Sequence, residues 1–333
     1  MFSSSPFLVA ADETLPEVLR CYAVGDKATV MPLGNHGGFS GAQLWRVFSP
    51  AGEFCLRRWP AGVGSRQLTE THRLIDHAGN AGLTFVPHIQ RTRDGKSMVS
   101  YQDRLWEVES WLPGKADFHR QPTAERIANA LTAVARIHHA WQSAACAGSC
   151  PAIQRRLVCA ERWQKLLATG WQPRLSAEQP PAMNLWAQRA WPIVRERTGA
   201  LALRLQISPG NQVPLQPCLC DIWHDHVLFS SDTVTGIVDY GSVRIDHVAV
   251  DLARLIGSMA GDDQQLRESA LEAYRRQRAL SADDTALMEL LDESGTLLGA
   301  ANWLMWVYHD GRLFPDMEKA ALRLAALVQR LEI

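Results

Sequence analysis

The pattern of apolar and polar positions changes once along the chain, close to residue 112. In residues 29–112, short strand-like runs alternate with glycine-containing breaks and enclose one helical segment, residues 66–77. Further along, apolar residues recur at helical spacing, first over residues 127–138. The pattern predicts an α+β protein of two lobes, a small sheet-bearing lobe over residues 1–112 and a larger, mainly helical lobe over residues 113–333.

Turn chemistry refines this division. The sequence Ser49-Pro50-Ala51-Gly52 separates two strand-like runs, residues 42–48 and 53–59, and predicts a hairpin. Another strand is expected over residues 105–111, and it ends at Leu112-Pro113-Gly114, where the chain must leave regular structure. Near the end of the sequence, residues 287–308 and 317–331 carry dense apolar faces that predict packing helices.

Composition narrows the range of partners. The chain has 34 Lys and Arg against 35 Asp and Glu, a formal net charge of -1, so no global field attracts nucleic acid or an anionic membrane. The sequence has no apolar run of the roughly 18 residues that a membrane span needs. Its seven cysteines lack the paired CxxC spacing of a zinc site. We therefore expect a cytoplasmic protein with reduced thiols and a small-molecule partner.

Residues 220–241 carry the strongest chemical signal. Two short apolar runs, residues 227–229 and 235–238, flank the turn Ser230-Ser231-Asp232-Thr233, so a hairpin is expected to bring Asp221 and Asp239 close together. Phosphoryl transfer needs one carboxylate to accept or orient the proton of a hydroxyl and another to hold magnesium. The segment supplies both carboxylates.

The same block resembles the aminoglycoside phosphotransferase and choline kinase superfamily, whose catalytic loop reads H-G-D-x-x-x-x-N and whose metal motif reads D-F/Y-G. Asp221 falls on the base position of the loop, and Asp239-Tyr240-Gly241 falls on the metal motif. Further matches lie at Asp251-Leu252-Ala253, at Ala133-Val134-Ala135-Arg136-Ile137-His138, and at Trp303 and Trp306. The resemblance covers most of the chain and implies a bilobal protein kinase-like fold.

This resemblance implies ATP and Mg²⁺ as cofactors, with Asp221 as the base and Asp239 as a metal ligand. Gly37-Gly38-Phe39-Ser40-Gly41 is similar to the family's nucleotide loop, in which Gly37, Gly38 and Ser40 let backbone amides approach phosphate. Arg57 takes the place of the family's phosphate-binding lysine and is expected to face the nucleotide, with Arg58 on the opposite face as a solvated charge.

Two further parts of the nucleotide site follow from the resemblance. Glu70, on the predicted helix, is the candidate partner of Arg57, although a lone glutamate on such a helix is as readily solvated. Adenine is expected to bond to backbone between Glu109 and Leu112, at Ser110, Trp111 and Leu112.

The sequence departs from the family where asparagine usually follows the base by five residues, because His226 stands there. Imidazole nitrogen suits softer divalent metals, so His226 as a ligand would favour Mn²⁺ over Mg²⁺. A hydrogen-bonding role for His226 stays open. A zinc site at His224-Asp225-His226 is not expected, since three successive residues cannot all face one ion.

Three functions stay open. The first is ATP-dependent transfer of the γ-phosphate to a hydroxyl of a small polar metabolite or an aminoglycoside-like compound. The second is a weak or inactive nucleotide-binding module, and the third is another transfer on the same fold, such as nucleotidylation. Glu289, Asp292 and Glu293 on a late helix could bind a cationic aminoglycoside, although such a run is more often a solvated acidic face.

Overall fold

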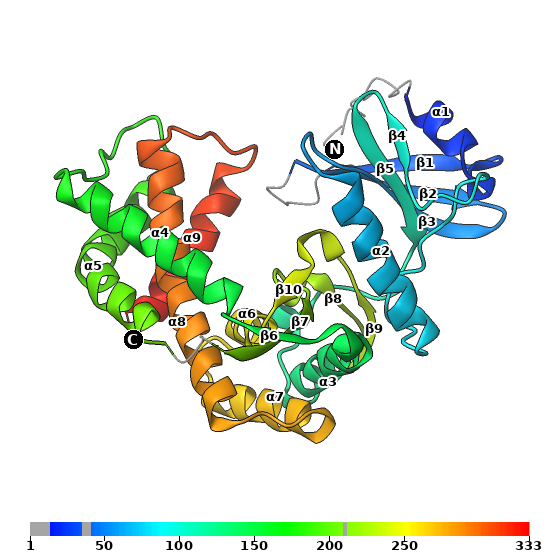
Figure 1. Cartoon of the computed structure of the whole chain (residues 1–333). Helices are drawn as coiled ribbons and strands as arrows, with labels where there is room; N and C mark the ends of the chain where they lie inside the picture. The colour runs from blue at the N-terminus through cyan, green and yellow to red at the C-terminus, as the bar shows by residue number, and fades with distance from the viewer. Residues whose placement is uncertain (1–13, 35–40, 209–211, 333) are drawn as a thin grey trace. The chain divides into compact units, whose positions relative to one another are not determined.

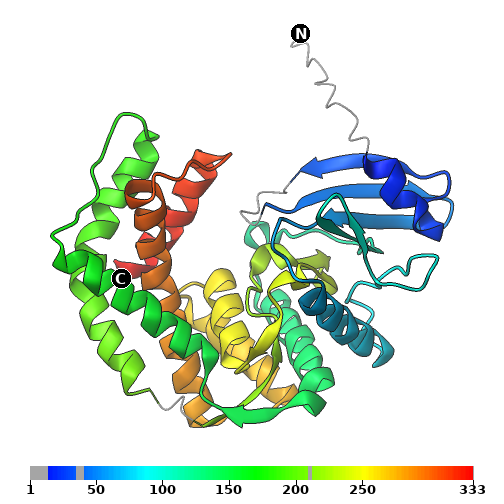
Figure 2. The ribbon, with the colours of Figure 1, turned by 45° about the horizontal axis from the view of Figure 1, so that its top comes forward.

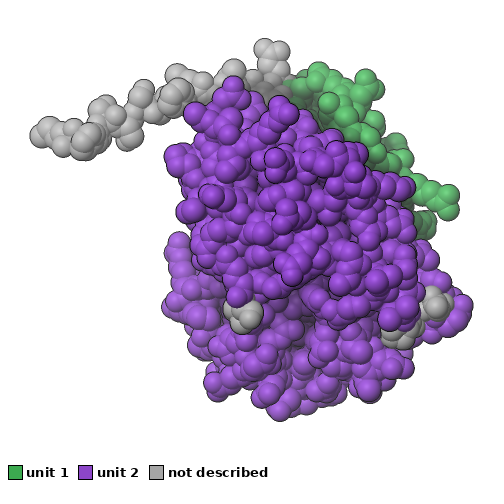
Figure 3. Space-filling model, turned by 90° about the vertical axis from the view of Figure 1, so that its left-hand side faces the viewer, with its two compact units in different colours: residues 1–76, 87–111 green, residues 77–86, 112–333 purple. Residues whose placement is uncertain are grey.

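The computed structural model describes residues 14–34, 41–208 and 212–332. The chain divides into two compact units, which Figure 3 distinguishes by colour. Unit 1 consists of residues 1–76 and 87–111, and unit 2 consists of residues 77–86 and 112–333. The α+β composition predicted from the sequence is confirmed, because strands dominate unit 1 and helices dominate unit 2 (Figure 1).

Unit 1 is built on a five-stranded antiparallel sheet with the strand order β1-β2-β3-β5-β4. The predicted hairpin is present: β2 and β3 pair from Gln43 opposite Arg58 to Ser49 opposite Gly52. The elements are α1 (Thr14–Arg20), β1 (Thr29–Gly34), β2 (Gln43–Ser49), β3 (Gly52–Arg58), α2 (Ser65–Asn80), β4 (Val99–Tyr101) and β5 (Arg104–Ser110).

The middle strands β3 and β5 of this sheet are buried on both faces, because α1 lies on one face of the sheet and α2 on the other (Figures 1 and 2). On one face, Leu56 and Val108 join the apolar core with Val18 of α1. Neighbouring residues of a strand point to opposite faces, so Arg57 and Glu107 lie on the other one. There a buried contact from α2 reaches Glu107.

Unit 2 is mostly helical, with two short sheets of order β10-β7-β6 and β8-β9. Its elements are α3 (Ala124–Ala140), β6 (Cys146–Gly148), α4 (Pro151–Ala168), α5 (Pro181–Gln206), β7 (Val213–Cys218), β8 (Val227–Ser230), β9 (Thr233–Ile237), β10 (Arg244–Asp246), α6 (Ala249–Met259), α7 (Gln264–Gln277), α8 (Ala282–Leu304) and α9 (Met317–Leu331). Among the described helices, none is both long and apolar enough to cross a membrane.

The helices of unit 2 form two groups. Helices α4, α5, α8 and α9 pack together, and α3 packs along α7 beside the short sheets (Figures 1 and 2). The helical spacing noted in residues 127–138 is explained by α3, on which Ile127, Leu131 and Val134 are all fully buried. Thr123 caps this helix by accepting a hydrogen bond from Arg126 N.

The compact units differ from the two continuous segments expected from the sequence in one stretch, residues 77–86. These residues belong to unit 2 because its contacts hold them: Phe85 O accepts from Ile237 N at 2.8 Å, and His77 Nε2 lies 2.9 Å from Ala140 O. The guanidinium of Arg136 also lies over the Phe85 ring. Local strand and helix patterns in the sequence cannot predict that residues 77–86 pack with unit 2.

Candidate active site

Asp221 lies in the loop between β7 and β8. Asp239 directly follows Val238, just after the end of β9. The hairpin β8–β9 pairs Val227 with Ile237 as predicted, and Val238 N donates to His226 O at 3.0 Å. Asp239 itself has the left-handed conformation, with φ of 65°, which turns its carboxylate out of the strand direction. The side chains of Asp221 and Asp239 are 49% and 45% exposed, so both carboxylates are open to a ligand.

Asp251 holds the loop that carries Asp221. Its fully buried carboxylate accepts hydrogen bonds from Leu219 N at 2.8 Å and Cys220 N at 2.6 Å. Cys220 has φ of 63°, a conformation that costs energy in a residue other than glycine and persists because the surroundings impose it. The carboxylate therefore fixes the backbone directly before Asp221.

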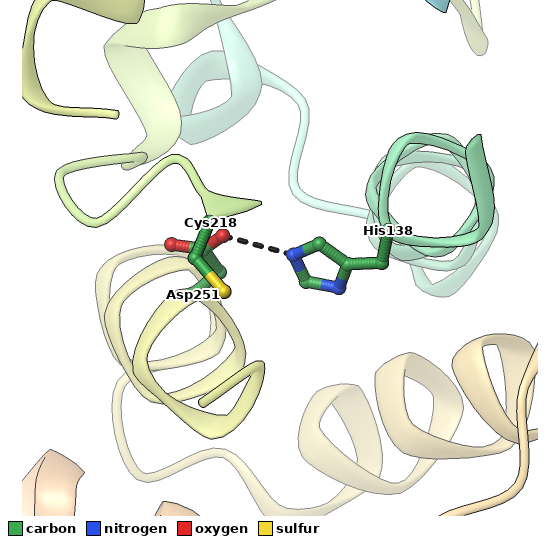
Figure 4. Close-up of side chains that lie close together, drawn as sticks. All are labelled: His138, Cys218 and Asp251. Atoms are coloured by element: carbon green, nitrogen blue, oxygen red, sulfur yellow. Dashed lines mark hydrogen bonds and ion pairs between the residues drawn. The ribbon is translucent and has the colours of Figure 1, made fainter. Parts of the chain in front are cut away.

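A second contact fixes Asp251 in turn. His138 of α3 lies with Nε2 2.9 Å from Asp251 Oδ2 (Figure 4). Its Nδ1 lies 2.8 Å from Tyr274 Oη. Cys218 completes a buried group of three possible metal ligands, whose ligand atoms all lie within 4.8 Å of one another. The oxygens of Asp251 are already engaged by backbone and imidazole, and burial raises the pKa of the Cys218 thiol well above its usual value. The group is therefore a positioning network for the loop.

Arg254 is the direct partner of the candidate base. It lies one helical turn after Asp251 on α6, and its Nη2 is 3.1 Å from Asp221 Oδ1. Both side chains are about half exposed. No local sequence pattern predicts this contact, because it depends on how α6 packs against the loop.

His226 lies between the two carboxylates and the indole of Trp223. Trp223 Nε1 donates to His226 Nε2 at 2.8 Å, while Asp239 Oδ2 is 3.6 Å from the same nitrogen. Burial lowers the pKa of His226, and the charges of Asp239 and Asp221 act against this effect. The imidazole is therefore neutral at pH 7, with its Nε2 lone pair directed to the indole.

Residues His224–His226 form a short 3-10 helix that directly follows Trp223. His224 N donates to Ser258 Oγ at 3.0 Å, and the His224 ring packs edge-on against the rings of Trp223 and His119. Burial lowers the pKa of His224 to about 4. On the Trp223 ring lies the guanidinium of Arg323 from α9, with its Cζ 4.4 Å from the ring centroid. Trp223 thus supports one imidazole and one cation beside Asp221.

In unit 1, Arg57 lies among carboxylates of β5. Its Nε is 3.4 Å from Glu107 Oε1 and its Nη2 is 3.7 Å from Glu109 Oε1, and all three side chains are buried. Arg58 points to the opposite face, as predicted, but it is not fully solvated, because its guanidinium lies over the Trp106 ring at 5.2 Å.

The expected pairing of Arg57 with Glu70 differs from the contacts observed. Glu70 Oε1 lies 2.8 Å from Arg73 Nη1 on the exposed face of α2. The α2 residue directed at the sheet is His72, whose Nε2 is 2.7 Å from Glu107 Oε2. Positions 70 and 72 are about 200° apart around a helix, so when His72 faces the sheet Glu70 must face away.

The remaining residues of the expected nucleotide site fall into two groups. Gly37, Gly38 and Ser40 lie outside the described residues. Ser110 is the last residue of β5 and Trp111 follows it, and their amides donate to His88 O and Glu53 O, respectively. Adenine would therefore need hydrogen-bonding groups other than these two amides, such as nearby carbonyls or the amide of Leu112.

Comparison with known proteins identifies the family of the chain. Residues 33–290 match the phosphotransferase enzyme family. The chain belongs to this family. It is an ATP-dependent small-molecule kinase with an alcohol group as acceptor. The family resemblance drawn from the Asp221 and Asp239 motifs is therefore confirmed.

Curated relatives of this kinase include homoserine kinases of Rhodopseudomonas palustris (strain BisB5), 25% identical over 85% of this chain and 80% of theirs, and of Methylobacterium nodulans, 25% identical over 86% and 83%. Solved structures with the same fold include an aminoglycoside phosphotransferase from Alicyclobacillus acidocaldarius, with a TM-score of 0.59, 14% identity and coverage of 99% and 95%. A microcompartment-associated aminopropanol kinase gives a TM-score of 0.57, 15% identity and coverage of 95% of both chains. The kinase-like fold is confirmed.

Proposed function

We propose that this kinase transfers the γ-phosphate of ATP to the hydroxyl of a small amino alcohol of the homoserine class, with Asp221 as the base. The observation that carries the proposal is the network that fixes Asp221: the backbone before it donates to the buried carboxylate of Asp251 from two consecutive amides. A base must be held in place to within a fraction of an ångström, and a rigid loop meets that need. The curated relatives named above are homoserine kinases, which suggests the acceptor class.

We infer different roles for the two carboxylate oxygens of Asp221. Arg254 lies beside Oδ1, which leaves Oδ2 for the proton of the acceptor. As the acceptor oxygen bonds to the γ-phosphorus, the bond to the bridging oxygen breaks, ADP leaves with that electron pair, and the acceptor proton passes to Oδ2. Asp221 therefore orients the hydroxyl as well as receiving its proton.

Asp239 is the proposed metal ligand. Its carboxylate is half exposed and offers the hard oxygen atoms that Mg²⁺ prefers. A bound divalent cation would neutralise negative charge on the phosphate oxygens. Two roles were left open for His226, metal ligand and hydrogen-bonding residue. The hydrogen bond from Trp223 favours the hydrogen-bonding role, because a nitrogen that accepts from the indole has no lone pair left for an ion.

Arg57 is the proposed contact of unit 1 with the nucleotide phosphates. Its guanidinium has five donors in a planar fork, a shape suited to phosphate oxygens, and two buried carboxylates lie beside it. Gly37, Gly38, Ser40 and the stretch Ser110 to Leu112 stay predictions for the phosphate loop and the adenine contacts.

ADP release tests this function. Wild type is assayed with L-homoserine, 3-aminopropan-1-ol, choline, ethanolamine, a sugar panel and aminoglycosides, each with Mg²⁺ and with Mn²⁺. We expect turnover with the amino alcohols and a product heavier by one phosphate in mass spectrometry. Asp221→Asn should lower kcat by about a thousandfold while ATP affinity stays close to wild type, because the base acts on the acceptor. A product carrying a nucleotide, or normal turnover by Asp221→Asn, would refute the assignment.

A further inference from the structure

Two arginines lie beside the loop of Asp221, among the carboxylates of Asp221, Asp225 and Asp239. These arginines reach the loop from different helices, Arg254 from α6 and Arg323 from α9. The cations beside the base are therefore permanent at physiological pH.

Arg254 can contact a ligand while it keeps its contact with Asp221. Its contact with Asp221 occupies one of its three nitrogens, and no second partner is recorded for it among residues 14–34, 41–208 and 212–332. The side chain is 47% exposed. An arginine fork binds a carboxylate through two parallel hydrogen bonds, so the unoccupied edge of Arg254 matches that group in shape and charge.

Arg323 belongs to the same charged group. Its guanidinium lies over the ring of Trp223, which follows Asp221 by two residues in the sequence. Burial lowers the pKa of Arg323, the charges of Asp225 and Asp221 raise it, and the charge of Arg254 lowers it further. These mutual effects mean that both arginines and Asp221 lie within electrostatic reach of one another.

Of the three acidic residues named as a possible site for a polycationic acceptor, Asp292 and Glu293 form ion pairs within unit 2, whereas Glu289 is exposed. Asp292 lies 2.8 Å from Arg330 and 3.0 Å from Arg267, and it is 10% exposed at its side chain. Glu293 lies 2.5 Å from Arg204. These ion pairs weaken the negative surface that this helix could offer to an aminoglycoside and leave Glu289 as its exposed acidic residue of the three.

We propose that Arg254, assisted by Arg323, binds a carboxylate of the acceptor and thereby selects hydroxylated amino acids over amino alcohols that lack the acid group. The inference rests on the proposed function. In L-homoserine three carbon atoms separate the hydroxyl oxygen from the carboxylate. An acceptor of this kind can present its hydroxyl to Asp221 Oδ2 while its carboxylate meets the guanidinium beside Oδ1.

The test compares two probes that differ in the carboxylate alone, L-homoserine and 3-aminopropan-1-ol. For each protein the measured quantity is the ratio of kcat/KM with homoserine to kcat/KM with aminopropanol. We expect wild type to favour homoserine, and Arg254→Ala to lower the ratio by about 100-fold, the loss typical of removing one partner of a charged hydrogen-bonded pair. Arg254→Lys, which keeps the charge but loses the fork, should lower the ratio by about 10-fold, as should Arg323→Ala.

The matched control is Arg276→Ala, a highly exposed arginine of α7 whose recorded partner is Glu272. Its ratio should equal that of wild type. The inference is overturned if Arg254→Ala loses activity equally with both probes, since Arg254 would then act on Asp221 or on the nucleotide rather than on the acceptor carboxylate. An unchanged ratio in Arg254→Ala overturns it as well.

Failure of the proposed function gives a different result, namely no ADP release by wild type with either probe. Calorimetric titration of L-homoserine then decides the inference directly. Binding to wild type that Arg254→Ala weakens by about 100-fold supports a carboxylate site. Equal binding to both proteins, or binding to neither, refutes it.

Discussion

The guanidinium of Arg57 and the carboxylate of Glu107 lie opposite each other on β3 and β5, in strand register, with Nε 3.4 Å from Oε1. His72 of α2 holds the other oxygen of Glu107 at 2.7 Å. In the arrangement expected from the family, a helix glutamate would orient the basic residue of the strand. Here a strand glutamate lies beside the arginine, and the helix contributes a histidine that fixes the glutamate.

This relationship predicts that Glu107→Gln will raise the KM for ATP by about 10-fold, because it removes the charge that orients Arg57. The expected effect on the KM for the acceptor is small. Glu70→Gln is the matched control, since Glu70 pairs with Arg73 on the exposed face of α2. Steady-state kinetics with ATP varied at saturating acceptor measure the effect. If Glu70→Gln were the damaging variant, the helix glutamate would be the functional partner after all.

The parts of this protein that follow from local sequence were predicted correctly. Turn residues between β2 and β3 and between β8 and β9 indicate both hairpins, and the period of α3 gives its buried face. Motif spacing was enough to recognise the family.

What the sequence did not reveal depends on tertiary packing. Glu70 and His72 are both polar residues on one amphipathic helix, and the sequence does not say which of them the sheet will face. Arg254 reaches Asp221 because Asp251 anchors α6 against the loop, a contact between residues about thirty positions apart along the chain. Pairings at such separations carry no local pattern.

The anchoring of the loop by Asp251 can be tested separately from the chemistry. Asp251→Ala leaves the amides of Leu219 and Cys220 buried without an acceptor, and we expect it to lower the free energy of unfolding by about 3 kcal/mol. Asp251→Asn keeps one acceptor oxygen and should cost less. Urea unfolding followed by tryptophan fluorescence gives both values. Equal stability of Asp251→Ala and wild type would show that the carboxylate does not hold the loop.

Nucleotide binding is expected to stabilise the fold in the presence of a divalent cation. A ligand at about 100 times its dissociation constant adds about 2.7 kcal/mol to the free energy of unfolding. We expect ATP with Mg²⁺ to raise the Tm of wild type, and Asp239→Asn to show a smaller rise, because the proposed metal contact is lost. Differential scanning fluorimetry at millimolar nucleotide measures both shifts. A Tm insensitive to ATP with either Mg²⁺ or Mn²⁺ would remove the nucleotide site.

Stability should fall as the solution becomes acidic, partly because of His224. Burial lowers the pKa of His224 from the usual 6.5 to about 4, so between these values the unfolded chain binds a proton that the folded protein does not. The stability contributed by keeping His224 neutral is complete above about pH 6.5 and is lost as the pH falls toward 4. His224→Asn should flatten the pH dependence of the urea midpoint in this window. The comparison variant is His119→Asn, which removes the ring that packs edge-on against His224. An identical slope in wild type and His224→Asn would contradict the assignment.

The role of His226 is decided by a pair of variants. If its imidazole positions the loop through Trp223, His226→Asn and Trp223→Phe should both lower kcat, by about 10-fold, and neither should change the ratio of activity with Mn²⁺ to activity with Mg²⁺. If the imidazole binds the ion instead, His226→Asn alone should move this ratio toward Mg²⁺.

The pH profile gives an independent readout of the role of His226. Because burial lowers the pKa of His226, the neutral form that accepts the indole hydrogen bond persists below pH 6.5, and any acid loss of activity due to His226 must lie below that value. Turnover of wild type and both variants with each metal from pH 5 to 8 measures all of these quantities, and a metal ratio altered in His226→Asn alone would restore His226 to the metal site.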